Sequence, residues 1–565
     1  MDSKYWSGSK NLVIINKSVI EHNSFLLKKK FNIKLYLRLN KKNQNKYVQK
    51  VDLFVKKKFL IYKKQIIKIL NKYSLIDESE EYWDKIISSW LFDIITVVKF
   101  RFDDLVFVKK NKNLYILYIN KDNFNYLNFS FDFFSKSAVS SDLNQFIYNQ
   151  IADVLKINKK PIDNKLNKRD LKDATVKNNI FSIIIFYFYN FCVRFLNPII
   201  LVDSYFNAKD CLKIIILSKG KILFVSSYNF FKNFTIKDAN KDFRNKIKIK
   251  QNDLFDKAFN SLLGFLLPTS FLENFNETKV NIKNYSKNIK LIGSAVCFFS
   301  NDNYKILTAE MLKNNKKSLI FAHGHSDGLM KYDSKFQFEL NNIHKHIDYS
   351  NKDGLGISNL RRLNSVIKIN HRNEFVTLFL TKVDSYFFKT NIFPIRTNNY
   401  LGVLNENFQF YKSLKKKIKI KFMLRPHLSS WNNEKKIWFK KFGKNLNIDT
   451  SINNKQLFHR SKIIVMGYIS VTTFEALYLD KPTIIFCNIK DYFFKKDHLF
   501  FFKILVDAKI IHKNSYEAAN FINNNYSNIE NWWQSDKVRN AIKIFKEKYC
   551  VDNYRFTDSL IKNLL

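Results

Sequence analysis

The stretch Ser461–Tyr492, SKIIVMGYISVTTFEALYLDKPTIIFCNIKDY, carries more information about the fold than any other part of this chain. Its apolar run Lys462–Met466 predicts a buried strand, and the polar residues Gly467–Ser470 predict a turn. A helix is predicted over Val471–Asp480, followed by a second buried strand over Thr483–Cys487. This order of strand, helix and strand is typical of a parallel sheet covered by helices.

Hydroxyl side chains crowd the first turn of the predicted helix, at Ser470, Thr472 and Thr473. The unpaired backbone N–H groups and the positive dipole end of a helix N-terminus favour a phosphate. Glu475 lies one turn further along, where its carboxylate can reach a ribose next to that phosphate. Taken alone, the segment fits equally well an ordinary strand–helix–strand unit whose helix is capped by hydroxyl residues.

A second segment, Ser318–Gly328 (SLIFAHGHSDG), also places polar residues at the end of a predicted strand. The strand ends directly in His323 and Gly324, and the glycine allows a close approach of the backbone. A histidine in this position suits a general base or a phosphate contact. The alternative is a histidine that only caps a turn.

Two His-x-His pairs raise the question of a metal site. His323 and His325 form the first pair, and His344 and His346 form the second, with Asp348 nearby. Histidine pairs of this kind occur in zinc and manganese sites. Because no third ligand follows at a recognisable spacing, we expect no metal and no cofactor.

The third segment, Lys421–Trp431 (KFMLRPHLSSW), again ends a predicted strand in a charged turn. Arg425 offers a fork of donors for a phosphate or carboxylate, and His427 can donate beside it. An ordinary surface turn in a lysine-rich protein is the alternative. Since parallel sheets bind ligands at the carboxyl ends of their strands, the three segments together predict one site in a cleft between two domains.

Composition indicates a globular protein with a strongly basic balance. Hydrophobic residues make up 46% of the 565 residues, and the net charge is +47. A nucleic-acid surface would use more arginine and would cluster its charge, whereas lysine is spread over this whole chain. We therefore expect no nucleic-acid partner, and we keep an anionic phospholipid surface that holds the acceptor as the alternative.

Cysteine usage and apolar runs bear on location. The chain has 5 cysteines and no CxxC pair, which favours a reducing compartment. No apolar segment near the N-terminus predicts a signal peptide. The run Ile180–Val202 is long enough to span a membrane, but Asn190, Arg194 and Pro198 interrupt it, so we interpret it as a buried helix. The predicted location is cytoplasmic, with a peripheral contact at the inner face of the membrane.

The pattern along the chain predicts an α/β protein with two Rossmann-like domains. Residues 1–371 form the first, acceptor-side domain, and a large helical insertion occupies about 45–285. Residues 372–530 form the second, donor-binding domain, and the helices of 531–565 cross back to the first domain. Strands are expected at Asn11–Asn16, Ile289–Phe298, Lys317–Ala322, Phe375–Thr381, Ile418–Leu424, Ile463–Met466 and Thr483–Cys487.

With these residues identified, the chain resembles, nearly end to end, a family of bacterial surface-antigen (O-antigen-type) transferases. The matching elements are Tyr82-Trp83 with Trp90-Leu91, Ala322–Gly328, Arg425–Trp431, Ser470–Glu475, Ile510–His512 and Trp532-Trp533 with Phe545 and Tyr549. More distantly, it is similar to the CDP-glycerol glycerophosphotransferases and other GT-B glycosyltransferases. The family pattern is not kept at Ala322, His325, Asp327, Ser430 and Val471, which leaves the donor open.

The resemblance implies a GT-B fold, a nucleotide-activated donor and no obligatory metal. It implies His323 near the reaction centre as base, with Arg425 and His427 facing the donor phosphates. It further implies that the donor is held by Gly324, His325, Gly328, Ser470, Thr472, Thr473 and Glu475.

The sequence thus favours a transferase that moves a sugar or sugar-like group from a nucleotide donor to a glycan or lipid-linked acceptor, as in O-antigen, lipopolysaccharide or capsule biosynthesis. A sugar-nucleotide 2-epimerase is the second hypothesis, and a non-enzymatic protein that binds polyanions or membranes is the third. The nucleotide, the sugar, the acceptor, inversion or retention and the oligomeric state stay open.

Overall fold

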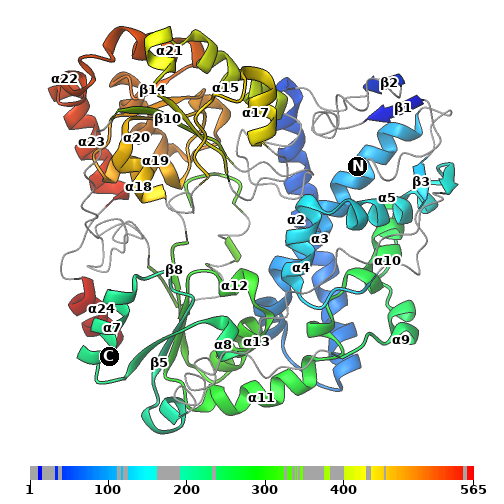
Figure 1. Cartoon of the computed structure of the whole chain (residues 1–565). Helices are drawn as coiled ribbons and strands as arrows, with labels where there is room; N and C mark the ends of the chain where they lie inside the picture. Colours follow the sequence, from blue (N-terminus) through cyan, green and yellow to red (C-terminus); the bar gives the residue numbers. More distant parts are fainter. Residues whose placement is uncertain are drawn as a thin grey trace.

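The computed structural model of the chain contains two parallel five-stranded sheets in separate halves of the molecule, beside a layer of long helices (Figure 1). The structure describes residues 11–14, 32–35, 41–110, 116–118, 125–161, 191–231, 237–323, 328–333, 337, 338, 340, 344–347, 374–381, 400–427, 434–450, 454–550 and 556–565. The two sheets confirm the predicted α/β, GT-B-like fold class.

The first sheet has the strand order β6-β5-β7-β8-β9, and all neighbouring strands are parallel. Its strands are β5 (Ile199–Val202), β6 (Ile222–Val225), β7 (Leu291–Ser294), β8 (Lys317–Phe321) and β9 (Lys345–Ile347). Every residue of β5 and β7 is buried, as expected for central strands with helices on both faces. The helices that follow these strands are α7 (Ala208–Leu217), α8 (Ser227–Phe230), α11 (Phe275–Lys287), α12 (Cys297–Ser300) and α13 (Asp302–Lys313).

A layer of helices lies beside the first sheet. It consists of α2 (Lys41–Ser74), α3 (Glu80–Lys109), α4 (Ser130–Val139), α5 (Ser141–Leu155), α9 (Lys241–Lys246), α10 (Leu254–Leu266) and the short helix η4 (Thr269–Phe271). Trp83 and Trp90 of α3 are buried in a core that these helices share with β5, β7 and α13. Two small parallel pairs accompany the layer, β1 (Asn11–Ile14) with β2 (Asn32–Leu35) and β3 (Ile116–Tyr118) with β4 (Lys159–Pro161).

The region of about 45–285, predicted as a large helical insertion, is mostly helical where it is described, but it also contains the strands β3, β4, β5 and β6. The interpretation of Ile180–Val202 as one buried helix is wrong at its end: residues 191–196 are helical, but Ile199–Val202 is the strand β5. Asn197 has a φ of 44°, which ends the helix before Pro198. A short apolar run does not by itself distinguish a buried strand from a buried helix.

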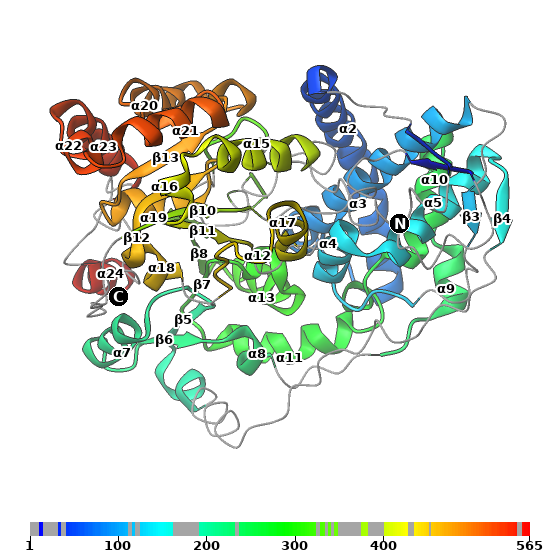
Figure 2. The same cartoon turned by 45° about the horizontal axis from the view of Figure 1, so that its top comes forward.

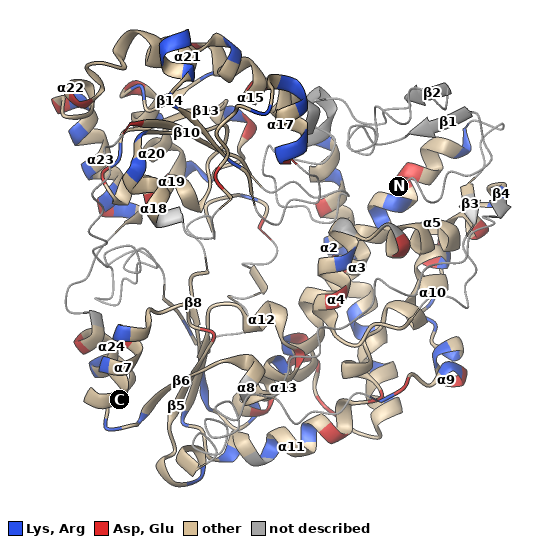
Figure 3. Cartoon of the chain, in the orientation of Figure 1, with Lys and Arg blue, Asp and Glu red and all other residues tan. Residues whose placement is uncertain are grey.

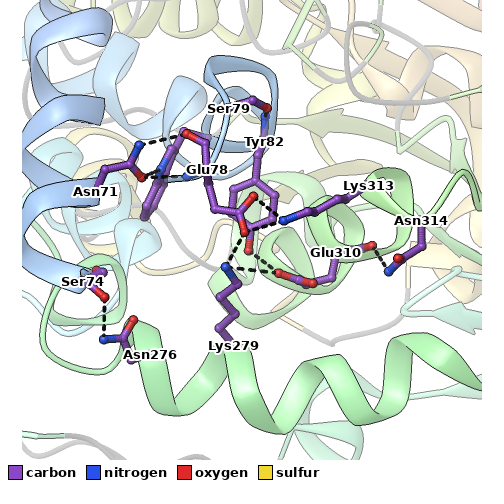
Figure 4. A network of polar contacts seen from close by, with 11 residues as sticks. Asn71, Ser74, Glu78, Ser79, Tyr82, Asn276, Lys279, Glu310, Lys313 and Asn314 are labelled. Carbon is purple, nitrogen blue, oxygen red and sulfur yellow. Dashed lines mark hydrogen bonds and ion pairs between the residues drawn. The ribbon is translucent and has the colours of Figure 1, made fainter. Parts of the chain in front are cut away.

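Polar contacts fasten the helical layer to the helices that cover the first sheet (Figure 4). Glu78, in the turn between α2 and α3, accepts hydrogen bonds from Lys279 Nζ of α11 at 2.5 Å and from Lys313 Nζ of α13 at 2.7 Å. The Tyr82 hydroxyl of α3 donates to Glu310 Oε1 of α13 at 2.8 Å. These contacts fix the layer against α13, the helix that precedes β8.

The second sheet has the order β11-β10-β12-β13-β14, again with parallel neighbours. Its strands are β10 (Phe375–Phe379), β11 (Phe422–Arg425), β12 (Ser461–Met466), β13 (Thr483–Phe486) and β14 (Ile511–His512). The predicted strand Ile418–Leu424 is wrong in its first residues, since α16 (Lys416–Lys419) occupies them, and β9 and β14 had not been predicted.

Helices cover both faces of the second sheet, because alternate residues of each strand point to opposite sides. Ile463 and Val465 of β12 pack on the side of α15 (Tyr400–Ser413) and α21 (Ser515–Asn525). Ile464 and Met466 pack on the side of α19 (Val471–Tyr478), α20 (Lys496–Asp507) and α23 (Asp536–Tyr549). Figure 2 shows these helices together in one half of the molecule. The remaining elements of this half are α17 (Glu434–Phe442), α18 (Asn454–Arg460), η8 (Ile489–Asp491) and α22 (Ile529–Trp533).

The C-terminal helices divide between the two halves. The helix expected over residues 531–548 forms α22 and α23, and its buried side chains pack with α19 and α20 in the second half. It is α24 (Phe556–Leu564) that returns to the first half, where Leu560 and Leu564 pack with Ile199 and Leu201 of β5. Figure 1 shows α24 beside α7. The domain boundary near residue 371 lies outside the described residues and stays a prediction.

None of the helices within the described ranges combines the length and the apolar character that a membrane span needs. Residues 180–190 of the apolar run considered above lie outside those ranges.

Candidate functional site

The N-terminus of α19 is held in place by its own first residues. Ser470 is the N-cap residue, and its side chain accepts a hydrogen bond from the Thr472 N–H at 3.2 Å. Thr473 Oγ1 accepts from the Ser470 N–H at 3.1 Å, which completes a capping box. Thr473 is fully buried, so its hydroxyl serves the helix itself, whereas Ser470 and Thr472 are half-buried.

The Tyr468 hydroxyl connects this helix start to the rest of the second sheet. It donates to the Leu380 carbonyl oxygen, just beyond β10, at 3.2 Å. Burial raises the pKa of Tyr468, and the negative charges of Glu434 and Glu475 raise it further, while hydrogen bonding with the side chains of Ser470 and Thr472 opposes the rise. The Tyr468 hydroxyl thus interacts with two hydroxyl side chains and lies within the electrostatic influence of two carboxyl groups. The sequence interpretation missed it, although it occupies the turn between the predicted strand and helix.

The sequence analysis also did not identify Glu434, the first residue of α17, as a candidate site residue. Only 4% of its surface is exposed, and its Oε2 atom has no hydrogen-bond partner among the described residues. Burial raises the pKa of Glu434 to about 8, although hydrogen bonding with the main-chain N–H of His427 opposes the rise. The unfolded chain releases this proton near pH 4.5 and the folded chain near pH 8, so this group makes the fold less stable as the pH rises between these values. The available signal was its position as the first acid after the turn that contains Arg425 and His427.

Arg425 ends β11 and is 5% exposed. Its Nη1 atom lies 3.2 Å from Asp449 Oδ1 and 3.3 Å from the Asp449 carbonyl oxygen. Burial lowers the pKa of Arg425, and the carboxylate of Asp449 opposes this. At least one arm of the guanidinium is therefore used inside the protein, while His427 is exposed two residues later. The contact of Arg425 and His427 with donor phosphates stays a prediction.

His323 lies at the carboxyl end of β8, on the first sheet. The preceding Ala322 N–H donates to the Ile347 carbonyl oxygen at 2.9 Å, which holds the chain against β9 up to this point. The His323 side chain is exposed, and its ring lies 5.2 Å from the Tyr205 ring at an angle of 39°. Tyr205 follows β5 and adopts a φ of 62°. The strands β5 and β8, which flank β7 in the sheet, thus place a phenol and an imidazole at the same edge of the sheet.

Gly324, His325 and Asp327 lie outside the described residues. Gly328 has a φ of 76°, a conformation that glycine adopts without strain, and its N–H donates to Asp333 Oδ2 at 3.2 Å. Of the second histidine pair, His344 Nδ1 accepts from the Ser318 N–H at 3.2 Å, which is a contact within the sheet. Within the part of the chain that the structure describes, no three histidine, cysteine, aspartate or glutamate side chains are placed to share a metal ion.

Residues 329–331 pair with the segment that precedes α20 in the second half of the molecule. Lys331 N–H donates to the Phe493 carbonyl oxygen, and Lys495 N–H donates to the Leu329 carbonyl oxygen, both at 2.9 Å. Beside this bridge, the Tyr492 hydroxyl accepts from the Ile469 N–H at 2.7 Å, one residue before Ser470. Five residues of chain, from His323 to Gly328, span at most about 18 Å. The hydrogen bonds of Phe493 and Lys495 with residues 329–331, together with that of Tyr492 with Ile469, therefore connect the described chain just after Gly328 with the residues that precede α19.

Comparison with models of known protein families gives a match for this chain. The model of the LIC12162 family transferase matches residues 2–564. Among curated proteins, no sequence matches this chain.

Solved structures that are similar to the chain include three enzymes. The wall teichoic acid polymerase TagF is 12% identical, over 68% of this chain and 94% of that chain, with a TM-score of 0.33. MurG from Acinetobacter baumannii is 8% identical, over 65% and 98%, with a TM-score of 0.32. WaaG, a glycosyltransferase involved in lipopolysaccharide biosynthesis, is 9% identical, over 65% and 99%, with a TM-score of 0.29. These scores are low, so the architecture rests on the strand topology described above.

Proposed function

The chain belongs to the LIC12162 family of transferases, and from this premise we propose that it moves a sugar or sugar-like group from a nucleotide-activated donor to a surface polysaccharide or glycolipid. The observation that carries the proposal is the start of α19, where the Tyr468 hydroxyl interacts with the side chains of Ser470 and Thr472. Glu475 of α19 and Glu434 of α17 act on the same hydroxyl electrostatically. Helix N-termini of this kind favour a phosphate.

In the proposed complex, the donor phosphate lies at the N-terminus of α19. The half-buried Ser470 and Thr472 contact it, and Arg425 and His427 approach it from the end of β11. The Glu475 carboxylate, which is 4% exposed and acts on the Tyr468 hydroxyl, accepts hydrogen bonds from the ribose. The predicted contacts of Gly324, His325 and Gly328 complete the donor site from the first sheet.

His323 acts as the general base in this proposal. Its exposed ring can reach an acceptor hydroxyl, and the neighbouring Tyr205 ring restricts its orientation. As the acceptor oxygen attacks the sugar carbon, His323 takes the hydroxyl proton, and the bond to the donor phosphate breaks with its electron pair on the phosphate oxygen. The helix N-terminus then stabilises the charge of the departing phosphate.

The two alternatives predict different chemistry. A 2-epimerase would change the sugar nucleotide in the absence of any acceptor, and membership of a transferase family does not favour it. A protein that only binds polyanions would show a steep dependence on salt and would ignore nucleotides.

A thermal-shift panel with CMP, CDP, UDP, GDP and dTDP tests the donor site. We expect one of these nucleotides to raise the melting temperature, because a ligand at a hundredfold its dissociation constant adds about 2.7 kcal/mol of stability. Glu475→Gln should lower the affinity for that nucleotide by about tenfold or more, since a hydrogen bond to a charged group contributes about 1.5–3 kcal/mol. Glu547→Gln, at an exposed position of α23, is the matched control. Stabilisation by polyanions alone would contradict the donor site.

We also propose that the lipid-linked acceptor is met at the membrane surface, through an exposed apolar face beside α7. Leu212 and Ile216 lie one helical turn apart on α7 and are 60% and 64% exposed. Leu196 lies beside Gly220, just beyond the end of α7, and Phe195 is 63% exposed. Basic residues on α7 and close to it in the sequence are also exposed, at Arg194, Lys209, Lys213, Lys219 and Lys221. Figure 3 colours the lysines and arginines of this helix blue. An apolar face with a basic rim fits an anionic bilayer.

Co-sedimentation with vesicles tests this contact. Vesicles that contain phosphatidylglycerol should bind the protein, and pure phosphatidylcholine vesicles should bind it at least about tenfold more weakly, because each lysine near an anionic surface contributes about 1 kcal/mol. Ile216→Glu should release the protein from the anionic vesicles. Leu53→Glu, on an exposed position of α2, should not. Equal binding of both variants would exclude this face as the contact.

A further inference from the structure

Glu434 presents a buried carboxyl group at the proposed donor site. Its side chain is 4% exposed, and its Oε2 atom has no hydrogen-bond partner among the described residues. It acts electrostatically on the Tyr468 hydroxyl, which also interacts with the side chains of Ser470 and Thr472 at the start of α19. A buried polar atom without a partner is rare in folded proteins and calls for an explanation, which a group of a bound ligand would supply.

The surroundings of Glu434 disfavour a negative charge. Glu434 interacts electrostatically with the Tyr468 hydroxyl, in the turn after β12, and Glu475 of α19 interacts electrostatically with the same hydroxyl. From the end of β11, the main-chain N–H of His427 contacts Glu434, and the positive charge of Arg425, two residues earlier, is already paired with Asp449. On its own helix, Lys435 and Lys436 are exposed to solvent. Since burial raises the pKa of Glu434 to about 8, most molecules carry the proton at neutral pH.

A phosphate next to Glu434 would interact very differently with the neutral and the ionised form of its carboxyl group. An ionised carboxylate accepts hydrogen bonds only and would repel the phosphate, whereas the neutral acid has an O–H donor that a phosphate oxygen can accept. The proton therefore converts Glu434 from a repulsive neighbour into a ligand.

We propose that Glu434 binds the donor phosphate as a neutral carboxylic acid, and that the ionised form must take up a proton from solvent before the donor binds. The proposal rests on the proposed function, in which the N-terminus of α19 holds that phosphate. It makes Glu434 a residue that determines specificity for the anionic donor, and it couples donor affinity to pH.

Calorimetric titration between pH 6 and pH 9 tests the proposal. The probes are the nucleotide that binds best in the panel above and inorganic pyrophosphate. For the wild type, we expect the dissociation constant to rise by about tenfold between pH 7 and pH 9, because the proton must then be taken up on binding. Repeating the titration at pH 9 in buffers of different ionisation enthalpy should show an uptake of close to one proton.

Glu434→Gln supplies the matched variant, since its amide replaces the neutral acid with a donor that does not titrate. We expect this variant to bind as the wild type does at pH 6, to lose the weakening at pH 9, and to take up about one proton fewer. Titration of the probe's own phosphate is the same for both proteins and cancels in the comparison. Glu434→Ala should bind weakly at every pH.

An unchanged pH dependence in Glu434→Gln would overturn the proposal for Glu434 while leaving the donor site intact. Wild-type protein that binds the nucleotide at pH 9 without taking up a proton would overturn it equally, and this measurement does not depend on the folding of any variant. Failure of the wild type to bind any probe at any pH would instead overturn the donor site, and the role of Glu434 with it.

Discussion

Replacing His323 by alanine is expected to lower the turnover of donor by at least about a hundredfold, because a general base typically contributes a factor of 10²–10⁴. His323 lies at the edge of the first sheet, whereas the proposed phosphate and ribose contacts belong to α19 of the second sheet. The dissociation constant of the nucleotide should therefore change by less than about threefold, which is below 0.7 kcal/mol. Donor consumption in the presence of acceptor, together with calorimetric titration of the nucleotide, measures both quantities.

Tyr205→Phe provides the control for this experiment. The phenylalanine keeps the ring that lies 5.2 Å from the His323 ring and removes only the hydroxyl. Turnover close to that of the wild type is expected for this variant. If His323→Ala retained full turnover, His323 would have no part in the reaction, and the base would have to be sought elsewhere at this sheet edge.

Replacing Asp302 by alanine is expected to destabilise the protein by about 3–5 kcal/mol, since it leaves a buried cation without its counter-ion. Asp302 and Lys305 are each 1% exposed, and Lys305 Nζ lies 3.0 Å from Asp302 Oδ1. Asp302 Oδ2 also accepts from the Ser130 N–H at 2.8 Å and from Ser270 Oγ at 2.5 Å. One carboxylate thus joins α13 to the start of α4 and to η4. Denaturant-induced unfolding, followed by tryptophan fluorescence, measures the loss.

An exposed ion pair in the same half of the molecule serves as the comparison. Lys237 and Glu277 lie 3.0 Å apart, with side chains 52% and 41% exposed. Glu277→Ala should cost less than about 1 kcal/mol, because solvent screens such a pair. A loss of similar size in both variants would show that burial of Asp302 is not the reason for its effect. The double variant Asp302→Leu with Lys305→Met should recover much of the lost stability, since it leaves neither charge unpaired.

Several positions in the second half could be predicted from the sequence because their structure depends on near neighbours. The helix predicted to start after Ser470 does so, and the residues that cap it, Ser470 and Thr473, lie within one turn of each other. The strands β12 and β13 follow their apolar runs closely. In the first half, Ile199–Val202 was assigned to a helix, because an apolar run of this kind becomes a strand only through its partners β6 and β7.

In the candidate site, too, some features could be predicted from the local sequence and others depend on tertiary contacts. The local alternation of apolar and polar residues predicts that His323 and Ser470 follow strands and that Arg425 ends one. The pairing of Arg425 with Asp449, 24 residues further along, depends on how strands and helices pack, and so does the electrostatic influence of Glu434 and Glu475 on the Tyr468 hydroxyl. Local hydrogen bonds and side-chain periodicity are properties of a short segment, and so the chain itself specifies them. Burial, the raised pKa of Glu434 and the hydrogen bonds that join Leu329 and Lys331 to Phe493 and Lys495 arise only when distant segments come together, and so they belong to the folded protein alone.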